Sequence, residues 1–515
     1  MSRTKSSIIN VITAFIGQGL GFLISFVARI FFIKILGEEY LGVNGLFTNI
    51  LTVLSLAELG VGTAITYSLY EPLAKKDKEK CKSLMYLYKK VYIIIGIIIL
   101  FVGSLITPFL GLFLKETPNI DNLKLIYLLF VVNTGISYFY SYKRNLIIAD
   151  QNRYIATIYR YSFYFILNVL QILYLIKYKN YIGFLIIQIV FTFLENYFVS
   201  RKANKMYPFL LDKNVNNVDK ETSTEIFKNT KAMMMHRIGG TIVNSTDNII
   251  LSKYVGLVQV GLYSNYYLIT SALNLVTVQI YNSLVPGIGN LKAENNKQKE
   301  YIVFQRLNFV TFWMYGFLTL CLLIMFNDFI SIWIGNKYTL SFEVVLIIII
   351  NFYLTGMRKS VLAFRDAMGL FYKDRYKAVV EALINIIVSI LLAIKMGIFG
   401  VFLGTFISSI TTCVWVEPFV LYKYGFKKKF SGYCIDYLKK VMIMILMGVL
   451  LYFIRLQFIG VGTICRFLIE LVICVVLING IFWLLYRNTD EFNYFIDLLK
   501  KIVKKINKKK QHSHE

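Results

Sequence analysis

The sequence is poor in the residues that most enzymes use for chemistry. Its 515 residues include three histidines and six cysteines, and the cysteines are scattered without the CxxC spacing of metal or redox sites. We find no P-loop, HExxH or GxSxG motif and no paired carboxylates in the larger polar segments, residues 71–90 and 201–231. These absences predict a protein that is not an enzyme, with no catalytic residues and no metal site.

Acidic residues are also scarce. Aspartate and glutamate total 29 against 56 lysines and arginines, a formal net charge of +27. The basic residues are dispersed over many short segments, and no nucleic-acid recognition motif accompanies them. Anionic lipid of the inner leaflet explains them better. We therefore expect membrane lipids, and no nucleic acid, as partners.

Apolar residues are abundant. They make up 57% of the chain, and the mean hydropathy is +0.61, too apolar for a soluble protein. Without water in the hydrocarbon layer the backbone must satisfy its own hydrogen bonds, so long apolar stretches are expected to be helices. We predict about fourteen transmembrane helices, at residues 8–33, 44–69, 91–112, 125–145, 156–176, 182–200, 234–254, 262–285, 303–326, 340–358, 378–395, 400–421, 439–459 and 463–486.

Lysine and arginine set the orientation of these helices. Most of them fall in the segments on the side of the N-terminus, which predicts that both termini are cytoplasmic. The outside connections are short, the longest being residues 113–124 and 327–339. After residue 486, apolar residues at helical spacing alternate with lysines, which predicts a basic amphipathic helix on the cytoplasmic face.

The sequence also contains an internal repeat. Residues 28–80 align without gaps with residues 247–299, and the pairs Lys34/Lys253, Gly37/Gly256 and Gly42/Gly261 are identical. Repeated halves around a central site are typical of transporters. Because each repeat holds an even number of spans, we expect two six-helix lobes related by a pseudo-two-fold axis along the membrane normal, with two extra helices. The predicted boundaries are an N-terminal lobe at 1–205, a linker at 206–233, a C-terminal lobe at 234–425, the extra helices at 426–486 and a tail at 487–515.

Polar residues inside the predicted helices are the candidates for function, because they are costly to hold in lipid. They share helix faces, recurring at spacings of three and four in the first, second, seventh and eighth spans. We expect these faces to enclose a hydrated cavity. The predicted substrate-binding residues are Gln18, Ser25, Arg29, Arg237, Asn244 and Asn274, and the predicted gating or ion-coupling residues are Glu58 and Asp247.

Each candidate has a structural alternative. Ser, Thr and Asn in membrane helices often bond a neighbouring helix. Arg29 and Asp247 lie nearer the outer ends and fit a structural pair or gate as well as substrate contact. Glu58 lies near mid-membrane, where it fits a proton-linked or lobe-locking role, paired with a cation such as Arg29 or Arg237 when ionised, or else simple packing.

Several motifs carry a family resemblance. LGEEYLGVNGLF at residues 36–47, LSLAELGVGTAI at 54–65 and YSLYEPLAKKDK at 67–78 resemble the start of bacterial polysaccharide-repeat-unit flippases of the polysaccharide transporter family. FRDAMGLFYKDRY at 364–376 and GIFGVFLGTFISS at 397–409 are similar to the C-terminal lobe of that family. The larger superfamily also holds multidrug and toxin extrusion exporters and the lipid II flippase.

The resemblance implies a substrate and a place. The substrate would be an undecaprenyl-pyrophosphate-linked oligosaccharide, flipped by alternating access across the bacterial cytoplasmic membrane for capsule, exopolysaccharide or O-antigen assembly. For such a substrate, the cations at the cytoplasmic ends of the fourth and tenth predicted spans would capture the headgroup or anchor in lipid phosphate: Lys143, Arg144, Arg358 and Lys359. Polysaccharide polymerase and glycosyltransferases are candidate protein partners. No cofactor is expected, and H+ or Na+ are candidate coupling ions. The alternatives are an ion-coupled small-molecule or drug exporter, a lipid II flippase, or a scaffold without transport.

Overall fold

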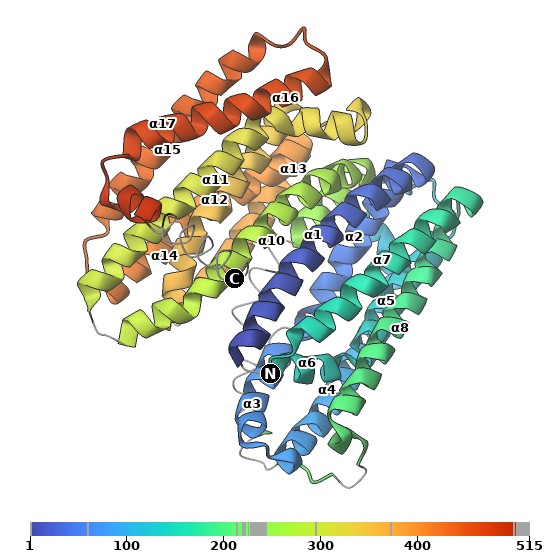
Figure 1. The fold of residues 1–515 in the computed structure, drawn as a ribbon. Coiled ribbons are helices and arrows are strands. Elements are labelled where there is room, and N and C mark those ends of the chain that lie inside the picture. The colour runs from blue at the N-terminus through green and yellow to red at the C-terminus, as the bar shows by residue number, and fades with distance from the viewer. Residues whose placement is uncertain are drawn as a thin grey trace, which may run out of the picture. The chain divides into compact units, whose positions relative to one another are not determined.

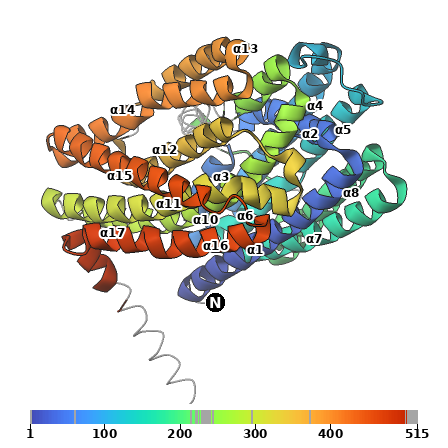
Figure 2. The same cartoon turned by 90° about the horizontal axis from the view of Figure 1, so that it is seen from above.

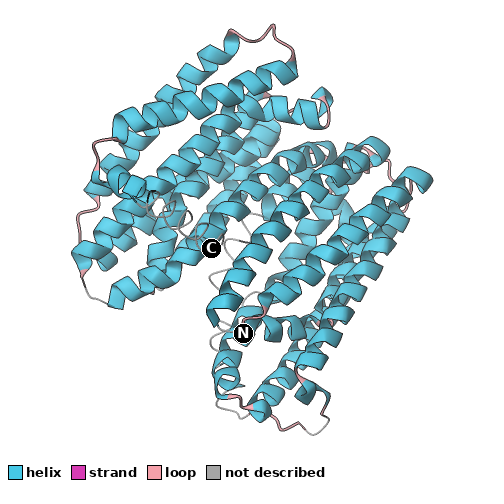
Figure 3. Ribbon diagram, in the orientation of Figure 1, coloured by secondary structure: helices cyan, strands magenta, loops and turns pink. Residues whose placement is uncertain are grey.

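A computed structural model describes residues 3–58, 61–212, 215–218, 223–224, 226, 241, 245–293, 296–370, 373–497 and 500. All regular secondary structure in these residues is helical (Figure 3), which confirms the predicted all-α class. The chain forms two compact units. The first comprises Met1–Ser264 with Ala393–Ile398, and the second Asn265–Leu392 with Phe399–Glu515.

In its described residues the first unit is built from α-helices and includes the beginning of one that continues in the second unit (blue to green in Figure 1). They are joined by short turns and by brief 3-10 or π segments. The helices are α1 (Arg3–Leu36), α2 (Glu38–Leu54), α3 (Val61–Lys75), α4 (Lys78–Ile106), α5 (Leu123–Tyr138), α6 (Ser141–Ala149), α7 (Arg153–Tyr178), α8 (Tyr181–Met206) and the start of α10 (Leu257–Ala293).

The second unit contains the rest of α10 and the helices that follow it in the described residues. Seen from above in Figure 2, α15 and α16 lie beside α11. The helices are α11 (Lys297–Trp333), α12 (Phe342–Ala367), α13 (Lys377–Thr411), α14 (Cys413–Val420), α15 (Ser431–Leu456), α16 (Thr463–Ile473) and α17 (Asn479–Tyr486).

Side-chain caps set several helix starts, and some lie outside the predicted apolar runs. Asp77 accepts a hydrogen bond from the backbone N–H of Lys80 at 2.9 Å, so α4 begins well before residue 91. Asn180 and Asn296 cap α8 and α11 in the same way. Hydropathy finds the part of a helix that lies in lipid, whereas the cap decides where the helix begins.

The second predicted span, residues 44–69, is not one continuous helix. The helix α2 ends at Leu54, a 3-10 turn occupies Ser55–Glu58, and α3 starts at Val61. The fourth predicted span, residues 125–145, also bends, by 42° between α5 and α6. Both predictions of a single helix were therefore wrong in detail, although the apolar segments themselves are helical.

The eleventh and twelfth predicted spans form a hairpin within and after α13. Gly397 has φ 58° and ψ −137°, a conformation that suits glycine, and it reverses the chain. The Asn385 amide donates to the hydroxyl of Thr405 at 3.0 Å, and the Ser389 hydroxyl donates to the carbonyl oxygen of Val401 at 3.0 Å. These contacts across the turn confirm two antiparallel spans where the apolar run alone is continuous.

The two extra C-terminal spans are fixed to the second unit by a buried ion cluster. Asp328 on α11 accepts from Arg455 on α15 at 2.9 Å and from Arg466 on α16 at 2.7 Å. Arg455 also pairs with Glu470 at 3.0 Å. One carboxylate therefore joins three helices, and α15 and α16 are integral to this unit.

The described residues contain nine helices long and apolar enough to cross a membrane, or ten if α5 and α6 count as one span. One of these runs over 50 residues, Lys377–Phe426, about 75 Å of helix against about 30 Å of hydrocarbon, so it holds the two spans of the Gly397 hairpin. The protein is thus a multi-pass membrane protein. The full count of fourteen stays a prediction.

The sequence repeat has a counterpart in the contacts of the first unit. A β-carbon on Gly42 would lie 2.1 Å from the carbonyl oxygen of Leu257, and one on Gly261 would lie 2.4 Å from the carbonyl oxygen of Glu38. In the alignment Gly42 corresponds to Gly261 and Glu38 to Leu257. Reciprocal contacts between equivalent positions are what a local two-fold axis produces.

We predict that the close backbone contacts at Gly42 and Gly261 leave no room for a side chain at either position. Gly42→Ala or Gly261→Ala should lower the stability of the detergent-solubilised protein by about 1–3 kcal/mol, because a methyl group would meet backbone atoms that cannot rotate away. Gly19→Ala is the matched control, since a β-carbon there meets nothing within 4 Å. Equal melting temperatures for all three variants would contradict the close contact.

Candidate functional site

The polar face predicted on the first span exists on α1 and contacts two other helices. The Ser25 hydroxyl bonds the hydroxyl of Tyr164 on α7 at 2.7 Å. The Arg29 Nη1 donates to the hydroxyl of Ser264 on α10 at 3.0 Å. The Gln18 Oε1 is buried without a hydrogen-bond partner in the described residues. Ser25 follows Gln18 by seven residues, and Arg29 follows Ser25 by four. This spacing places the three side chains on one side of α1.

Arg29 is a partly buried cation with a neutral partner. A guanidinium has five N–H donors in a planar fork, and the described contacts use one of them. No carboxylate in the described part of the chain pairs with it. Charge within a membrane span is costly and is usually paired or functional. Arg29 is therefore a candidate residue for binding an anion.

The repeat counterpart of Arg29 is Asn248, next to Asp247. The Asp247 residue is 8% exposed, and the Asn248 Oδ1 is buried without a hydrogen-bond partner in the described residues. Gly45 is the counterpart of Ser264, and a β-carbon on it would lie 4.0 Å from the Asn248 amide nitrogen. The Arg29–Ser264 and Asn248–Gly45 contacts are thus equivalent in the repeat.

The other predicted substrate residues are Arg237, Asn244 and Asn274. Arg237 and Asn244 lie outside the described residues. Asn274 belongs to the second unit, where its Oδ1 accepts from the Tyr315 hydroxyl at 3.2 Å. Tyr315 also bonds Thr277 at 2.7 Å. In the described residues, Asn274 therefore joins α10 to α11.

Glu58 lies in the 3-10 turn of the second span and contacts phenols. Its Oε2 accepts from the hydroxyl of Tyr138 on α5 at 3.0 Å, and its Oε1 from Tyr92 on α4 at 3.4 Å. The Asn145 amide on α6 donates to Tyr92 at 3.0 Å. The expected cations, Arg29 or Arg237, are not among the described partners. Glu58 instead joins the broken span to α4 and α5, and Tyr92 extends the network to α6.

We predict that Glu58→Gln folds but translocates substrate more slowly or loses its pH dependence. The amide keeps one acceptor oxygen for one tyrosine and removes the negative charge. Glu71→Gln is the matched control, because Glu71 is an exposed residue of α3 paired only with Lys75 at the surface. Rates and pH profiles equal to those of the unchanged protein would assign Glu58 to packing.

Two cations expected to capture a headgroup or to anchor in lipid phosphate have internal partners. Lys143 on α6 donates to the Asn204 Oδ1 on α8 at 2.8 Å. Arg144 pairs with Glu195 at 2.5 Å and donates to Asn196 at 3.0 Å. These bonds tie α6 to α8.

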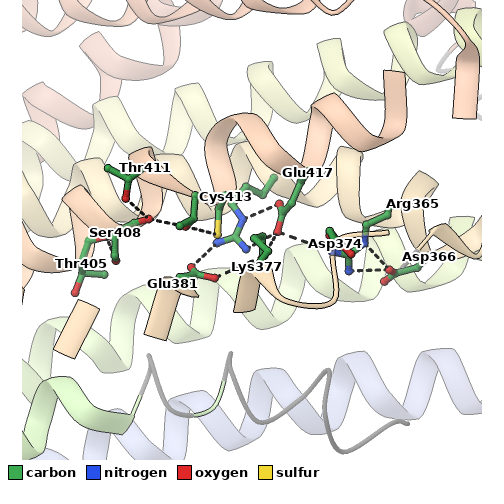
Figure 4. A network of polar contacts seen from close by, with 12 residues as sticks. Arg365, Asp366, Asp374, Lys377, Glu381, Thr405, Ser408, Thr411, Cys413 and Glu417 are labelled. Atoms are coloured by element: carbon green, nitrogen blue, oxygen red, sulfur yellow. Dashed lines mark hydrogen bonds and ion pairs between the residues drawn. The ribbon is translucent and has the colours of Figure 1, made fainter. Parts of the chain in front are cut away.

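The second unit contains a larger buried ion cluster, which the sequence reasoning missed (Figure 4). Arg358 on α12 makes a bidentate pair with Glu417 on α14, at 2.8 and 3.0 Å, and lies 3.5 Å from Glu381 on α13. Lys377 contacts both of these carboxylates. Glu417 is fully buried. The sequence did hold one signal of this cluster, because Glu417 lies inside the predicted apolar span 400–421.

The family-like motif at residues 364–376 continues this cluster. Arg365 pairs with Asp374 at 2.7 Å and with Asp366 at 2.9 Å, as Figure 4 shows. These ion pairs therefore tie the end of α12 to the segment that leads into α13. Arg358, expected as a headgroup cation, is already neutralised by carboxylates.

We predict that Glu417→Gln destabilises the protein by about 3–5 kcal/mol, because it leaves two buried cations without full compensation. Thermal unfolding in detergent measures this. Asp366→Asn is the matched control within the same network, since its side chain is half exposed, and it should change stability by less than about 1 kcal/mol. Equal melting points for the two variants would contradict a structural role for the cluster.

The sequence comparison identifies the family. Residues 7–292 match the family described as polysaccharide biosynthesis protein. The chain belongs to this family. This membership confirms the expected relationship to polysaccharide flippases. Among curated proteins, none matches the sequence.

Solved structures show the same fold. A lipid II flippase MurJ in an inward closed conformation matches 93% of this chain and 99% of its own, with a TM-score of 0.72 and 14% identity. An inward-facing multidrug resistance MATE family transporter of the MOP superfamily matches 79% of this chain and 96% of its own, with a TM-score of 0.63 and 14% identity. A MATE transporter from Vibrio cholerae matches 83% and 99%, with a TM-score of 0.56 and 15% identity. This family member therefore has the fold of flippases and transporters.

Proposed function

We propose that this family member flips undecaprenyl-pyrophosphate-linked oligosaccharides from the inner to the outer leaflet of a bacterial cytoplasmic membrane, by alternating access. The family match and the transporter fold support it. In this proposal both termini are cytoplasmic, and the product is used for surface polysaccharides such as capsule, exopolysaccharide or O-antigen. A polymerase and glycosyltransferases would be its functional partners.

The observation that carries the proposal is Arg29. A pyrophosphate cannot cross hydrocarbon without a compensating charge, because an unpaired ion in a low-dielectric medium is expensive. Arg29 offers that charge on a membrane-spanning helix, with a hydroxyl instead of a carboxylate as its described partner. Its planar fork matches phosphate oxygens in a bidentate manner.

The neighbouring groups suit sugars. Gln18 has a buried carbonyl oxygen without a described partner, and Ser25 and Tyr164 present hydroxyls on the same side of α1. Neutral hydrogen-bonding groups and aromatic rings bind hydroxyl-rich ligands without adding charge. In our proposal the oligosaccharide extends along this face while Arg29 holds the pyrophosphate.

Coupling is proposed at Glu58 and Asp247. A carboxyl group can alternate between accepting from two phenols and donating to one acceptor, and this would bias the broken second span. Protons or sodium ions would supply the driving force. Arg237 and Asn244, predicted on the seventh span, remain proposed substrate residues.

Lipid II is the second candidate substrate. The MurJ structure covers 93% of this chain, whereas the MATE structures reported above cover 79% and 83%. Lipid II shares the polyprenyl pyrophosphate and differs in the attached sugar and peptide. A drug exporter is less well supported, because a cationic drug needs available carboxylates and Glu58 is hydrogen-bonded to two tyrosines.

We predict that Arg29→Ala abolishes polymer production in cells that depend on this protein, at unchanged protein level. Arg29→Lys should restore only part of it, because a lysine lacks the bidentate fork. Lipid-linked oligosaccharide should accumulate in the Ala variant. Lys177→Ala, an exposed cation of α7, is the matched control and should leave production unchanged. Full polymer production by Arg29→Ala would contradict the proposed role.

A further inference from the structure

An apolar groove runs between α1 and α7 in the first unit. Its volume is about 630 Å³, within the range of small-molecule sites, about 300–1,000 Å³. Its lining is dominated by aliphatic and aromatic side chains that stay largely exposed. The apolar lining residues with the greatest exposure are Ile16, Leu20, Leu23, Ile158, Phe165 and Ile166.

The floor of the groove is an aromatic ring packed on two glycines. A β-carbon on Gly17 would lie 2.3 Å from Tyr161, and one on Gly21 would lie 2.7 Å from the same ring. The Tyr161 ring therefore occupies the space that side chains would fill at both positions. This packing holds the floor in place between the two helices.

Hydrogen bonds link α1 to the α6–α7 region on both sides of the groove residues. At one end the Asn10 side chain donates to the carbonyl oxygen of Gln151 at 2.8 Å and accepts from the backbone N–H of Tyr154 at 2.7 Å. At the other end Ser25 bonds Tyr164 at 2.7 Å. From residue 13 to residue 24 the slot is about 16 Å long, at 1.5 Å per residue.

A cation lies beside the floor. The Arg160 guanidinium is exposed, and its central carbon lies 6.0 Å from the centre of the Tyr161 ring. In the described residues Arg160 forms no ion pair with a carboxylate. Arg153, one turn from the Thr157 that lines the groove, is exposed as well. A long apolar slot beside an exposed cation matches an anionic lipid.

We propose that this groove holds the isoprenoid chain of the carrier lipid while its phosphate contacts Arg160, before the headgroup moves to Arg29. This inference rests on the proposed function. The groove is a single slot, and a polyprenyl carrier has one chain per headgroup, whereas a phospholipid has two. The groove also shares α1 with Gln18, Ser25 and Arg29, so a lipid seated there has its headgroup on the substrate-binding helix.

Photolabelling tests the groove directly. The purified full-length protein is placed in vesicles with a polyprenyl diphosphate that carries a diazirine in its isoprenoid chain, and a parallel sample receives phosphatidylglycerol with a diazirine in its acyl chain. Labelled peptides are mapped by mass spectrometry. We expect the polyprenyl probe to label residues 13–24 and 157–166, and unlabelled polyprenyl diphosphate to suppress this labelling.

Variants distinguish the contact of the groove with the isoprenoid chain from the contact of Arg160 with the phosphate. Leu20→Trp should fill the slot and abolish the labelling, whereas Leu173→Trp, an exposed residue of α7 outside the groove, should not. Arg160→Gln should weaken labelling about tenfold, because one charge-assisted hydrogen bond is lost. Arg160→Lys should restore part of it. Equal folding of the variants is checked by their melting temperatures.

The outcomes distinguish this inference from the proposed function. Labelling of these segments by phosphatidylglycerol alone, equal labelling by both probes without competition, or labelling elsewhere would overturn the groove assignment. If lipid-linked oligosaccharide still crosses the same vesicles in that case, the proposed function stands. Competable labelling of the groove without any translocation would support the groove and count against flipping.

Discussion

The backbone contact at Gly42 and Gly261 is the constraint on which the rest of the first unit depends. Two copies of one repeat meet there with no room for a side chain. The crossing brings the end of α1 beside the start of α10, which places Arg29 against Ser264. Each copy reaches the crossing through a glycine with positive φ, Gly37 at 88° and Gly256 at 128°. The polar contacts of α1 therefore follow from glycines, which carry no chemistry themselves.

Polar groups in the membrane are mostly used to join helices. The carboxylates Asp328, Glu58 and Glu417 each hold three or more helices together. Such bonds neutralise buried charges. A cation that is already paired with a carboxylate no longer attracts an anionic ligand. Arg29 differs in having a hydroxyl as its described partner, and this difference separates a candidate binding residue from a structural one.

The sequence predicted the helical class, the repeat and the family, because hydropathy, basic residues and turn glycines are local signals. It predicted less well where helices break, since the turn at Glu58 depends on tyrosines of α4 and α5. The Arg358–Glu417 pair was missed because its members are far apart in the chain and meet only through the packing of α12 on α14. Headgroup roles for Lys143, Arg144 and Arg358 assumed free charges, and packing supplied each with a partner.

The central claim is that the cargo is a lipid-linked oligosaccharide. Its most direct test places undecaprenyl-pyrophosphate oligosaccharide in vesicles containing the purified protein and follows its exposure to a membrane-impermeant glycosidase over time. The account predicts that the lipid crosses much faster than in protein-free vesicles and that lipid II competes weakly. Translocation of lipid II alone, or of neither lipid under any ion gradient, would contradict it.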